Sequence, residues 1–382
     1  MSKILFSHSY FYRFDPKQWE DGRPYPPYGT IYAAALMRQE GHQVSLYDTN
    51  LKENTKDIIP LLEKERPDYF VIYDDGFNYL TKMCLTNMRE AAFEMIKYAK
   101  KINCTIIVSS SDSTDHYDKY LQNGADYILL GEGEITLKEL IEQTNDGTLK
   151  PDELLGIAWK KDGKSTRNGR RPVIRSLDEL PDPAWDLIDI APYKKIWMEK
   201  QGYFSLNIAT TRGCPYKCNW CAKPIYGNRY NSRSPQRVAD EMERLTKDFG
   251  AEHFWVCDDI FGLKPKWVQE FRDIVKAKNL KLKYKIQSRA DLLLKEDNIE
   301  ALADSGLHEV WIGAESGSQK ILDAMDKGTK VEQIYEATRL LKSKGVRICF
   351  FLQFGYLKES MEDIDKTIKI CLLYTSPSPR DS

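Results

Sequence analysis

Short apolar runs alternate with amphipathic segments along residues 1–145. Runs rich in β-branched and aromatic residues predict strands at 3–8, 42–48, 69–75, 102–110 and 126–131. Apolar positions at helical spacing predict helices at 29–41, 55–66, 88–101, 118–125 and 134–143. Five strand–helix units in succession predict an α/β domain built on a doubly wound parallel sheet. Ligands of such sheets bind beyond the carboxyl ends of the strands.

Residues 146–200 interrupt this pattern and are predicted to form a hairpin and a Pro-rich linker. "GIAWKKDGKSTRNGRRPVI" favours two strands around a Gly-containing turn, and "LDELPDPAWDLIDIAPY" is the linker. The hairpin gathers six basic residues: Lys160, Lys161, Lys164, Arg167, Arg170 and Arg171. No aromatic residues alternate with these charges at the turn, so a solvated hairpin is favoured over a nucleic-acid patch.

The alternation resumes over residues 201–370, which are predicted to be the second domain. Strands are predicted at 205–211, 253–259, 283–289, 309–315 and 346–354, each followed by a helix. Five such units without closure predict an incomplete barrel. The last segment, "CLLYTSPSPRDS" at 371–382, resembles the translated end of a sequencing adapter. A natural Ser/Pro-rich tail is the alternative; an adapter would imply a chain cut short near Ile370.

Composition adds limits to this picture. A chain of 382 residues favours two domains, and 42% hydrophobic with 30% charged residues is typical of a globular protein. A net charge of −1 gives no reason to expect a nucleic-acid partner. No apolar run is long enough to span a bilayer, and the first residues lack the features of a signal peptide, so we expect a cytoplasmic protein.

Three of the eight cysteines lie within "GCPYKCNWC": Cys214, Cys218 and Cys221 have the spacing C-x3-C-x2-C. A structural zinc site needs four ligands, and the nearest further candidates, His253 and Cys257, lie more than thirty residues away. A cubane iron–sulfur cluster held by three cysteines keeps one iron open to another ligand. The spacing therefore favours an open 4Fe-4S cluster, with zinc or unbound thiols as the alternatives.

"RGCPYKCNWC" at the end of a strand resembles the signature of the radical S-adenosylmethionine (SAM) enzymes, and the resemblance extends over residues 205–370. It implies a partial (β/α)6 barrel whose sixth unit is missing. "CDDIFG", "QSRADLL" and "GAESGSQKILDAMDKGT" resemble the motifs that follow successive barrel strands, although the more usual Gly-Gly-Glu is absent. The residues that the resemblance places around SAM are Trp220, Asp258, Asp259, Ser288, Arg289, Glu315 and Ser316.

The first domain resembles the cobalamin-binding domains fused ahead of radical SAM barrels. "PPYGTIYAAALMRQEGHQVSLYDTN", "NGADYILLGEGEITLKEL" and "LDELPDPAWDL" carry this resemblance. No histidine lies in a D-x-H-x-x-G motif, so the resemblance implies that cobalamin binds with its tail base displaced. The expected contacts are Ser109, Ser110, Gly131, Glu132 and Gly133. Alternatively, "GEGE" only caps the following helix.

By these resemblances the chain is a cobalamin-dependent radical SAM enzyme that cleaves SAM reductively to a 5′-deoxyadenosyl radical. Methyl transfer to an unactivated carbon is the expected reaction, and ring formation or other non-methylation chemistry is the alternative. A zinc-binding module without catalysis is the alternative of another class. The expected partners are a small-molecule or lipid-like substrate and an external electron donor such as a flavodoxin or ferredoxin. The sequence names no catalytic residue.

Overall fold

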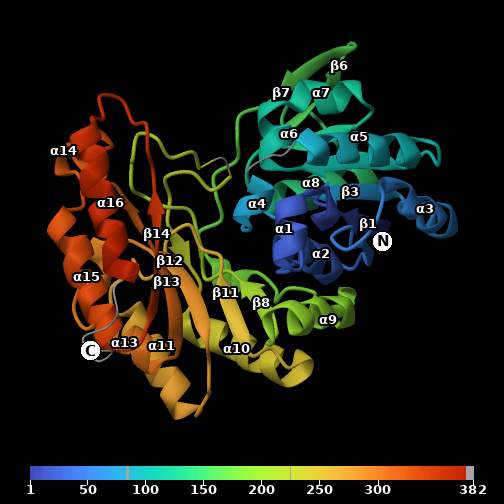
Figure 1. Ribbon diagram of the computed structural model, residues 1–382. Coiled ribbons are helices and arrows are strands. Elements are labelled where there is room, and N and C mark those ends of the chain that lie inside the picture. Colours follow the sequence, from blue (N-terminus) through green and yellow to red (C-terminus); the bar gives the residue numbers. More distant parts are fainter. Residues whose placement is uncertain (83–85, 224, 376–382) are drawn as a thin grey trace. The chain divides into compact units, whose positions relative to one another are not determined.

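The computed structural model describes residues 1–82, 86–223 and 225–375 and divides the chain into two compact units (Figure 1). Unit 1 contains Met1–Phe204 and a short return of the chain at residues 225–226. Unit 2 contains Ser205–Lys223 and the residues from Gly227 onward. No helix in the described part of the chain has the length and apolarity needed to cross a bilayer.

Unit 1 is built on a seven-stranded sheet with the order β2-β1-β3-β4-β5-β6-β7. Its parallel strands are β1 (Lys3–Ser7), β2 (Gln43–Tyr47), β3 (Tyr69–Tyr73), β4 (Thr105–Ser109) and β5 (Tyr127–Leu129). The predicted hairpin forms as β6 (Ile157–Lys161) and β7 (Lys164–Arg167), and β6 pairs antiparallel with β5. The parallel sheet is thus confirmed, and the hairpin belongs to it rather than to a connector.

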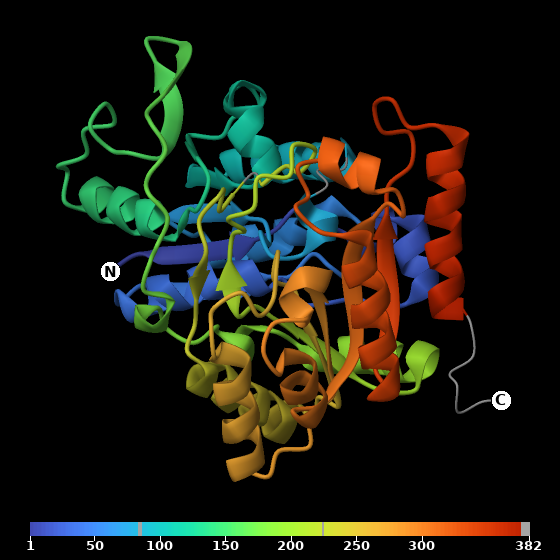
Figure 2. The same cartoon turned by 90° about the vertical axis from the view of Figure 1, so that its left-hand side faces the viewer.

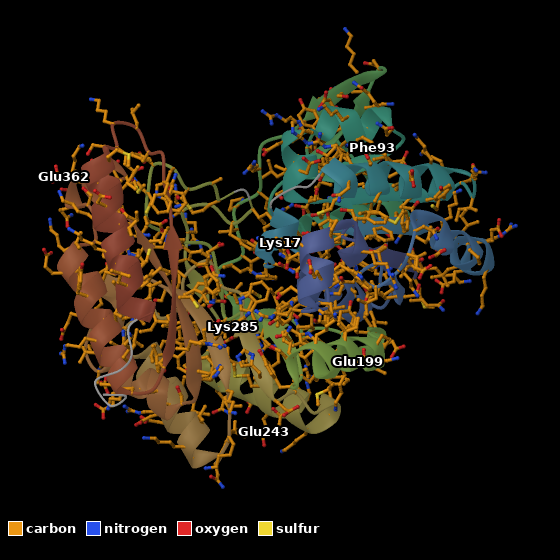
Figure 3. The ribbon with its side chains drawn as sticks, in the orientation of Figure 1. Lys17, Phe93, Glu199, Glu243, Lys285 and Glu362 are labelled. Atoms are coloured by element: carbon orange, nitrogen blue, oxygen red, sulfur yellow. The ribbon has the colours of Figure 1, made fainter. Side chains whose placement is uncertain are left out.

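Helices cover both faces of this sheet because successive strand residues point to opposite sides. On one face α3 (Ile59–Glu65), α5 (Thr86–Lys100) and α7 (Tyr117–Gln122) pack through side chains such as Met95 on Ile72 and its neighbours. Phe93 of α5, labelled in Figure 3, meets Tyr120 of α7 edge to face at 5.0 Å. On the other face α2 (Tyr28–Gln39) and α8 (Glu134–Asn145) cover Val71 and Leu129.

The region predicted to be a Pro-rich linker contains a further helix, α9 (Ile190–Gln201), that sequence patterning missed. Trp197 of α9 is buried and donates its indole N–H to the carbonyl of Pro24 at 2.7 Å, while Tyr193 donates to Asp48 at 2.7 Å. These contacts attach α9 to unit 1. The remaining short helices of unit 1 are Tyr12–Phe14, Pro16–Asp21, Thr55–Ile58, Tyr79–Lys82, Ser111–Asp115 (α6), Leu177–Glu179 and Trp185–Leu187.

Unit 2 is a five-stranded parallel sheet with the order β14-β13-β12-β11-β8, which is the partial barrel predicted from the sequence (Figure 2). Its strands are β8 (Ser205–Ile208), β11 (His253–Val256), β12 (Tyr284–Ser288), β13 (Leu307–Glu315) and β14 (Arg347–Leu352). The helices are α10 (Pro235–Phe249), α11 (Trp267–Ala277), α12 (Ala290–Leu293), α13 (Asn298–Asp304), α14 (Gln319–Ala324), α15 (Val331–Ser343) and α16 (Met361–Thr375). Two short strands, β9 (Thr211–Arg212) and β10 (Asn231–Ser232), pair beside the sheet.

Helix α16 packs closely on the loop after β13. A Cβ at Gly317 would lie 2.2 Å from the carbonyl oxygen of Lys366, so the loop approaches the helix backbone at a glycine. Asp363 of α16 accepts a hydrogen bond from Ser318 at 2.6 Å. The helix continues through Thr375, beyond Ile370, and the rest of the adapter-like tail lies outside the described residues.

Strand β14 is the outer strand of the unit 2 sheet, and within the described residues no other strand pairs with its far side. Large apolar side chains remain exposed on it and on the loop that follows: Phe351 is 40% exposed, Phe354 51% and Leu357 77%. This edge therefore combines the open side of an outer strand with exposed apolar side chains.

Candidate functional site

The cysteine loop lies between β9 and β10, just beyond the carboxyl end of β8. Cys214 and Cys218 are half-buried, and Cys221 is exposed. Gly213 has a φ of +79°, and a Cβ there would lie 2.3 Å from the carbonyl oxygen of Arg229. The chain can enter the loop in this conformation only because residue 213 is a glycine.

Hydrogen bonds hold the cysteine loop in place. The Lys223 ammonium donates to the carbonyl of Cys214 at 3.2 Å and to that of Tyr216. The backbone N–H of Asn219 donates to the carbonyl of Met325 at 3.1 Å, and the Tyr356 hydroxyl donates to the Asn219 side chain at 2.5 Å. The loop is thus fixed both within itself and against the segments that follow α14 and β14.

The three thiols suit an iron–sulfur cluster better than a single ion. Burial raises the pKa of the Cys214 and Cys221 thiols, the nearby Cys218 raises both further, and the Lys223 ammonium opposes the increase. Among the described residues no group of three or more His, Cys, Asp or Glu side chains is arranged to hold one metal ion. Zinc needs all its ligands about 2.0–2.3 Å from one centre, whereas a cubane distributes three thiolates over three irons. The three cysteines of this loop supply soft thiolate donors that do not converge on one point, and this arrangement fits a cubane cluster.

Arg289 follows β12 and its side chain lies against the cysteine loop. Its guanidinium carbon lies 3.8 Å from the centroid of the Tyr216 ring, and Nη1 lies 4.0 Å from the sulfur of Cys218. The same guanidinium pairs with Asp291 at 2.8 Å and donates to the carbonyl of Lys327 at 2.7 Å. Arg289 is therefore buried beside the thiols, with most of its donors already used within unit 2.

Glu315 ends β13 with a φ of +60°, a conformation that non-glycine residues rarely adopt. Its carboxylate pairs with the Lys327 ammonium at 2.9 Å, and each side chain is 6% exposed. The same ammonium lies 5.9 Å from the centroid of the Trp220 ring, which is 39% exposed. A Cβ at Gly313 would lie 2.8 Å from the Lys327 nitrogen, so the pair occupies the space above that glycine.

Asp258 and Asp259 differ in their surroundings. The Asp258 carboxylate is buried and accepts from the backbone N–H groups of Thr210 and Thr211 at 2.7 and 3.0 Å. Burial raises the pKa of Asp258 to about 6 although these hydrogen bonds oppose the increase. Asp259 is exposed, and its charge raises the pKa of the Cys214 thiol. Asp259 is consequently the more accessible of the two carboxylates.

The two predicted serines are also occupied by contacts within unit 2. The Ser288 hydroxyl donates to the carbonyl of Phe261 at 3.0 Å. The Ser316 hydroxyl is buried and lies 2.9 Å from that of Thr367 on α16. Ser288 thus connects the end of β12 to the loop after β11, and Ser316 connects the loop after β13 to α16.

Sequence reasoning missed three residues that connect the predicted ones. Lys327 joins Glu315, Trp220 and Arg289, Tyr216 stacks on Arg289, and Asn219 fixes the cysteine loop to the segment after α14. Lys327 lies in "DAMDKGT", within the motif that follows the fourth barrel strand. A lysine inside that motif was the sequence signal that could have identified it. Tyr216 and Asn219 lie between the cysteines, and their spacing alone gives no sign of their contacts.

In unit 1 the predicted cobalamin contacts lie at the carboxyl ends of β4 and β5. The Ser110 hydroxyl caps α6 by accepting from the N–H of Ser113 at 2.8 Å. Gly131 has a φ of +81° and donates its N–H to Thr114 at 3.1 Å. A Cβ at Gly133 would lie 2.8 Å from the Ser109 hydroxyl, and Glu132 accepts from the N–H of Ile174 at 2.5 Å. These five residues therefore form one edge of the sheet.

The carboxyl edge of this sheet also carries a buried histidine. His8, directly after β1, is 2% exposed and bonded through Nε2 to Asp48 at 2.8 Å. Thr49 contacts the same ring at 3.2 Å. The ring of His8 is thus held within the loops after β1 and β2.

Comparison with known proteins agrees with the two units. Residues 208–371 match the radical SAM superfamily, and residues 21–141 match the B12 binding domain. An uncharacterized methyltransferase of Pyrococcus horikoshii is 29% identical over 90% of this chain and 72% of its own length. The anaerobic magnesium-protoporphyrin IX monomethyl ester cyclase of Rubrivivax gelatinosus is 29% identical over 72% of this chain and 50% of its own length.

Among solved structures, the cobalamin-dependent SAM radical enzyme OxsB with aqua-cobalamin bound superposes with a TM-score of 0.80. It is 22% identical, and the match covers 97% of this chain and 52% of that one. The chain therefore spans between half and about seven tenths of the length of these proteins.

A partial barrel with three cysteines at the end of its first strand is typical of radical SAM enzymes, and residues 208–371 belong to that superfamily. The sheet domain that precedes the barrel matches the B12 binding domain over residues 21–141, so the chain combines the two domains of the cobalamin-dependent radical SAM enzymes. Its cofactors are accordingly a 4Fe-4S cluster, SAM and cobalamin. The question of zinc or an open cluster is answered in favour of the cluster.

Proposed function

We propose that the protein transfers a methyl group from cobalamin to an unactivated carbon of a small molecule. The similarity to a methyltransferase along 90% of the chain carries this proposal. When bound, the cofactors supply radical cleavage of SAM and a methyl donor. Overall, one substrate C–H, two SAM and two electrons give one C–CH3, S-adenosylhomocysteine, methionine and 5′-deoxyadenosine.

The chain's own residues provide binding and orientation in this proposal. Cys214, Cys218 and Cys221 hold the cluster, and the hydrogen bonds of Lys223 and Asn219 keep their loop in shape. Asp259, the exposed one of the acidic pair, is our candidate for the SAM amino group. Trp220 is the candidate for the adenine, and Glu315, which Lys327 holds in position, for the ribose.

We assign a supporting role to four of the predicted residues: Asp258, Ser288, Arg289 and Ser316. Their hydrogen-bond donors and acceptors are used within unit 2, so these side chains would hold in position the loops that carry the SAM contacts. Arg289 keeps one direct role, because its Nη1 lies 4.0 Å from the sulfur of Cys218, where the positive charge of the guanidinium would offset part of the negative charge of the cluster.

Radical chemistry without methyl transfer is the second candidate function. The similarity to a cyclase, with the same identity over 72% of the chain, favours it. Both reactions would use the same cysteine loop and the same cobalamin edge, so they differ in the products formed from SAM rather than in the cofactors.

The partners follow from the same chemistry. We propose a flavodoxin or ferredoxin as the electron donor, a small or lipid-like molecule as the substrate, and a cytoplasmic location that keeps the three thiols reduced. The formal net charge of −1 supports a reaction without nucleic acid.

The test is electron paramagnetic resonance of the anaerobically reconstituted, dithionite-reduced protein, combined with analysis of SAM products. We expect a cluster signal that shifts on adding SAM and is absent in Cys218→Ala. With substrate, S-adenosylhomocysteine should form together with 5′-deoxyadenosine. Formation of 5′-deoxyadenosine alone would favour the second candidate. A wild-type protein that binds zinc and forms no cluster would contradict both.

A further inference from the structure

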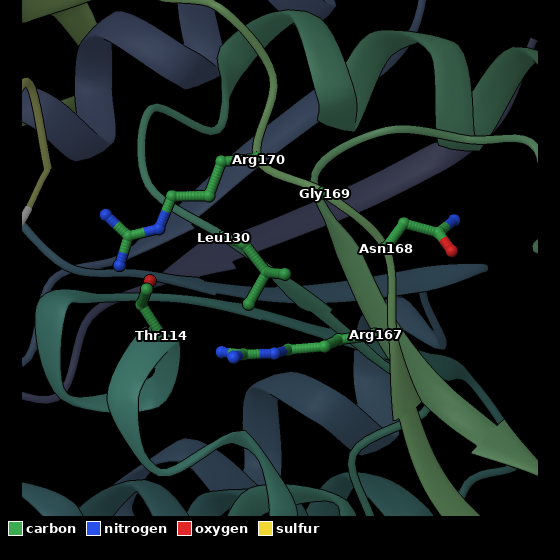
Figure 4. Close-up of a pocket in the computed structure, with 6 residues that line it drawn as sticks. All are labelled: Thr114, Leu130, Arg167, Asn168, Gly169 and Arg170. Carbon is green, nitrogen blue, oxygen red and sulfur yellow. The ribbon is translucent and has the colours of Figure 1, made fainter.

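The pocket shown in Figure 4 belongs to the edge of unit 1 where we propose that cobalamin binds. Thr114, Leu130 and residues 167–170 line it, and Leu130 directly precedes Gly131, one of the proposed cobalamin contacts. The pocket is therefore part of a site already described. In unit 2, by contrast, the cysteine loop makes a contact with the loop after β14 to which the proposed function assigns no role.

This contact is made by Asn219, which lies between two of the cluster cysteines and is held at both ends of its side-chain amide. Its Nδ2 donates to the carbonyl of Ala324 at 2.8 Å, and its Oδ1 accepts from the Tyr356 hydroxyl at 2.5 Å. The same hydroxyl lies 3.2 Å from the Ala324 carbonyl. An amide suits this place because it offers a donor and an acceptor side by side. The Tyr356 hydroxyl therefore fixes the direction in which the amide points.

The loop that carries Tyr356 is anchored independently of the cysteine loop. The N–H of Gly355 donates to the Glu359 carboxylate at 2.6 Å, and the N–H of Glu359 donates to the carbonyl of Tyr356 at 2.9 Å. The ammonium of Lys320, on α14, donates to the carbonyl of Lys358 at 3.0 Å. Tyr356 itself is half-buried. Its hydroxyl thus extends from a fixed support and can determine the position of the amide that it binds.

The segment that Asn219 binds also carries a residue that organises the proposed SAM contacts. Ala324 lies three residues before Lys327, whose ammonium pairs with Glu315 at 2.9 Å and lies 5.9 Å from the centroid of the Trp220 ring. Trp220 directly follows Asn219 in the chain and is 39% exposed, so its own packing restrains it only in part. The hydrogen bonds of Asn219 therefore set the position of Trp220 relative to Lys327 and Glu315.

We propose that Tyr356 is a positioning residue for SAM, which acts through Asn219 by holding Trp220 in place beside Lys327 and Glu315. This inference rests on the proposed roles of Trp220 and Glu315 in binding SAM, and it adds to them a residue of the loop after β14. Without the hydroxyl, Oδ1 of Asn219 loses this donor and the amide is free to turn. Binding groups held less firmly in their productive geometry bind more weakly, so the affinity for SAM falls.

The experiment is a SAM titration of the anaerobically reconstituted, dithionite-reduced full chain, followed by the shift of the cluster's electron paramagnetic resonance signal. We expect Tyr356→Phe to bind iron and sulfide to the same extent as the wild type and to weaken SAM binding about fivefold, the effect of one hydrogen bond. Tyr335→Phe is the matched control, because it removes the hydroxyl of an exposed tyrosine on α15 of the same unit. Its affinity for SAM should stay within about twofold of the wild type.

A double variant tests whether the hydroxyl acts through Asn219. Asn219→Ala should itself weaken SAM binding, and adding Tyr356→Phe to it should cost less than about twofold more, because the acceptor is already gone. Additive losses would overturn the link through Asn219. An unchanged SAM affinity in Tyr356→Phe would overturn the positioning role, and so would loss of iron from that variant, which would indicate support of the cluster alone. A wild-type cluster signal that is indifferent to SAM would instead reject the SAM contacts on which the inference rests.

Discussion

Lys327 and Glu315 form a buried ion pair at the end of β13, and each depends on the other. Both side chains are 6% exposed, and the pair lies between Gly313 and the ring of Trp220. Removing one partner of such a pair leaves an uncompensated charge in a poorly solvated place, which costs more than the pair itself contributes. Lys327 therefore has consequences for stability as well as for the position of Glu315.

We expect Lys327→Met to lower the free energy of unfolding by about 3–5 kcal/mol, measured by urea denaturation of the metal-free protein. The double variant with Glu315→Gln should recover part of this loss, because no lone charge remains. Arg339→Gln, which breaks an exposed pair with Glu336, is the control and should change stability by less than about 1 kcal/mol. Equal losses in the single and double variants would contradict the ion-pair explanation.

At this scale the sequence revealed the types of residues but not their partners. The cysteine spacing predicted the cluster ligands because the loop is local in sequence. Whether Arg289 reaches a ligand or the loop of Cys218 depends on contacts with Asp291, Lys327 and Tyr216, up to 73 residues apart. No spacing rule contains that information.

Strand β11 begins with a buried histidine at the amino end of the barrel. Nδ1 of His253 lies 2.9 Å from the Ser205 hydroxyl of β8, and His308 lies edge-on to it at 5.7 Å between ring centroids. Burial lowers the pKa of His253 from 6.5 to about 3, and that of His308 is lowered too. The folded protein thus keeps these rings neutral in a range where an unfolded chain binds protons.

The sign of the resulting pH dependence follows from linkage. Above about pH 6.5 His253 is neutral in both the folded and the unfolded state. Between about pH 6.5 and 3 only the unfolded state is protonated, so the free energy of unfolding decreases as the pH is lowered through this window. We expect the slope of unfolding free energy against pH to be smaller in His253→Gln than in the wild type across that window. Urea denaturation at a series of pH values measures it. Parallel curves for the two proteins would be inconsistent with a buried neutral ring.

Elements were predicted best where periodicity was regular. The strands of both sheets were recognised because apolar runs and helical segments alternate regularly. Helix α9 was missed because the prolines before it dominate the pattern, while its burial depends on contacts of Trp197 and Tyr193 with distant loops. The pairing of the hairpin with β5 was missed for the same reason, since sequence gives a hairpin its turn but not its neighbour.

At the scale of the whole molecule, the proposed cofactors bind to different units. The cluster cysteines lie in unit 2, and the residues proposed for cobalamin lie in unit 1. A ligand that binds only the folded state stabilises the part of the protein that holds it. Cobalamin should therefore raise the unfolding temperature of unit 1, and the cluster should raise that of unit 2.

We expect scanning calorimetry under anaerobic conditions to show two transitions. Hydroxocobalamin should raise one of them, and cluster reconstitution should raise the other, each by several degrees. In Cys218→Ala the shift caused by the cluster should disappear while the shift caused by cobalamin remains. A single transition raised equally by both cofactors would mean that the units unfold together.

The exposed edge at β14 has a practical consequence. An outer strand that carries the exposed Phe351, and that is followed by the exposed Phe354, can add a strand from another chain. Because such pairing is bimolecular, its extent grows with protein concentration. Dilute handling, or a lysine substituted for Phe351, would then keep the purified protein monodisperse, and the edge becomes a natural place to graft a capping peptide.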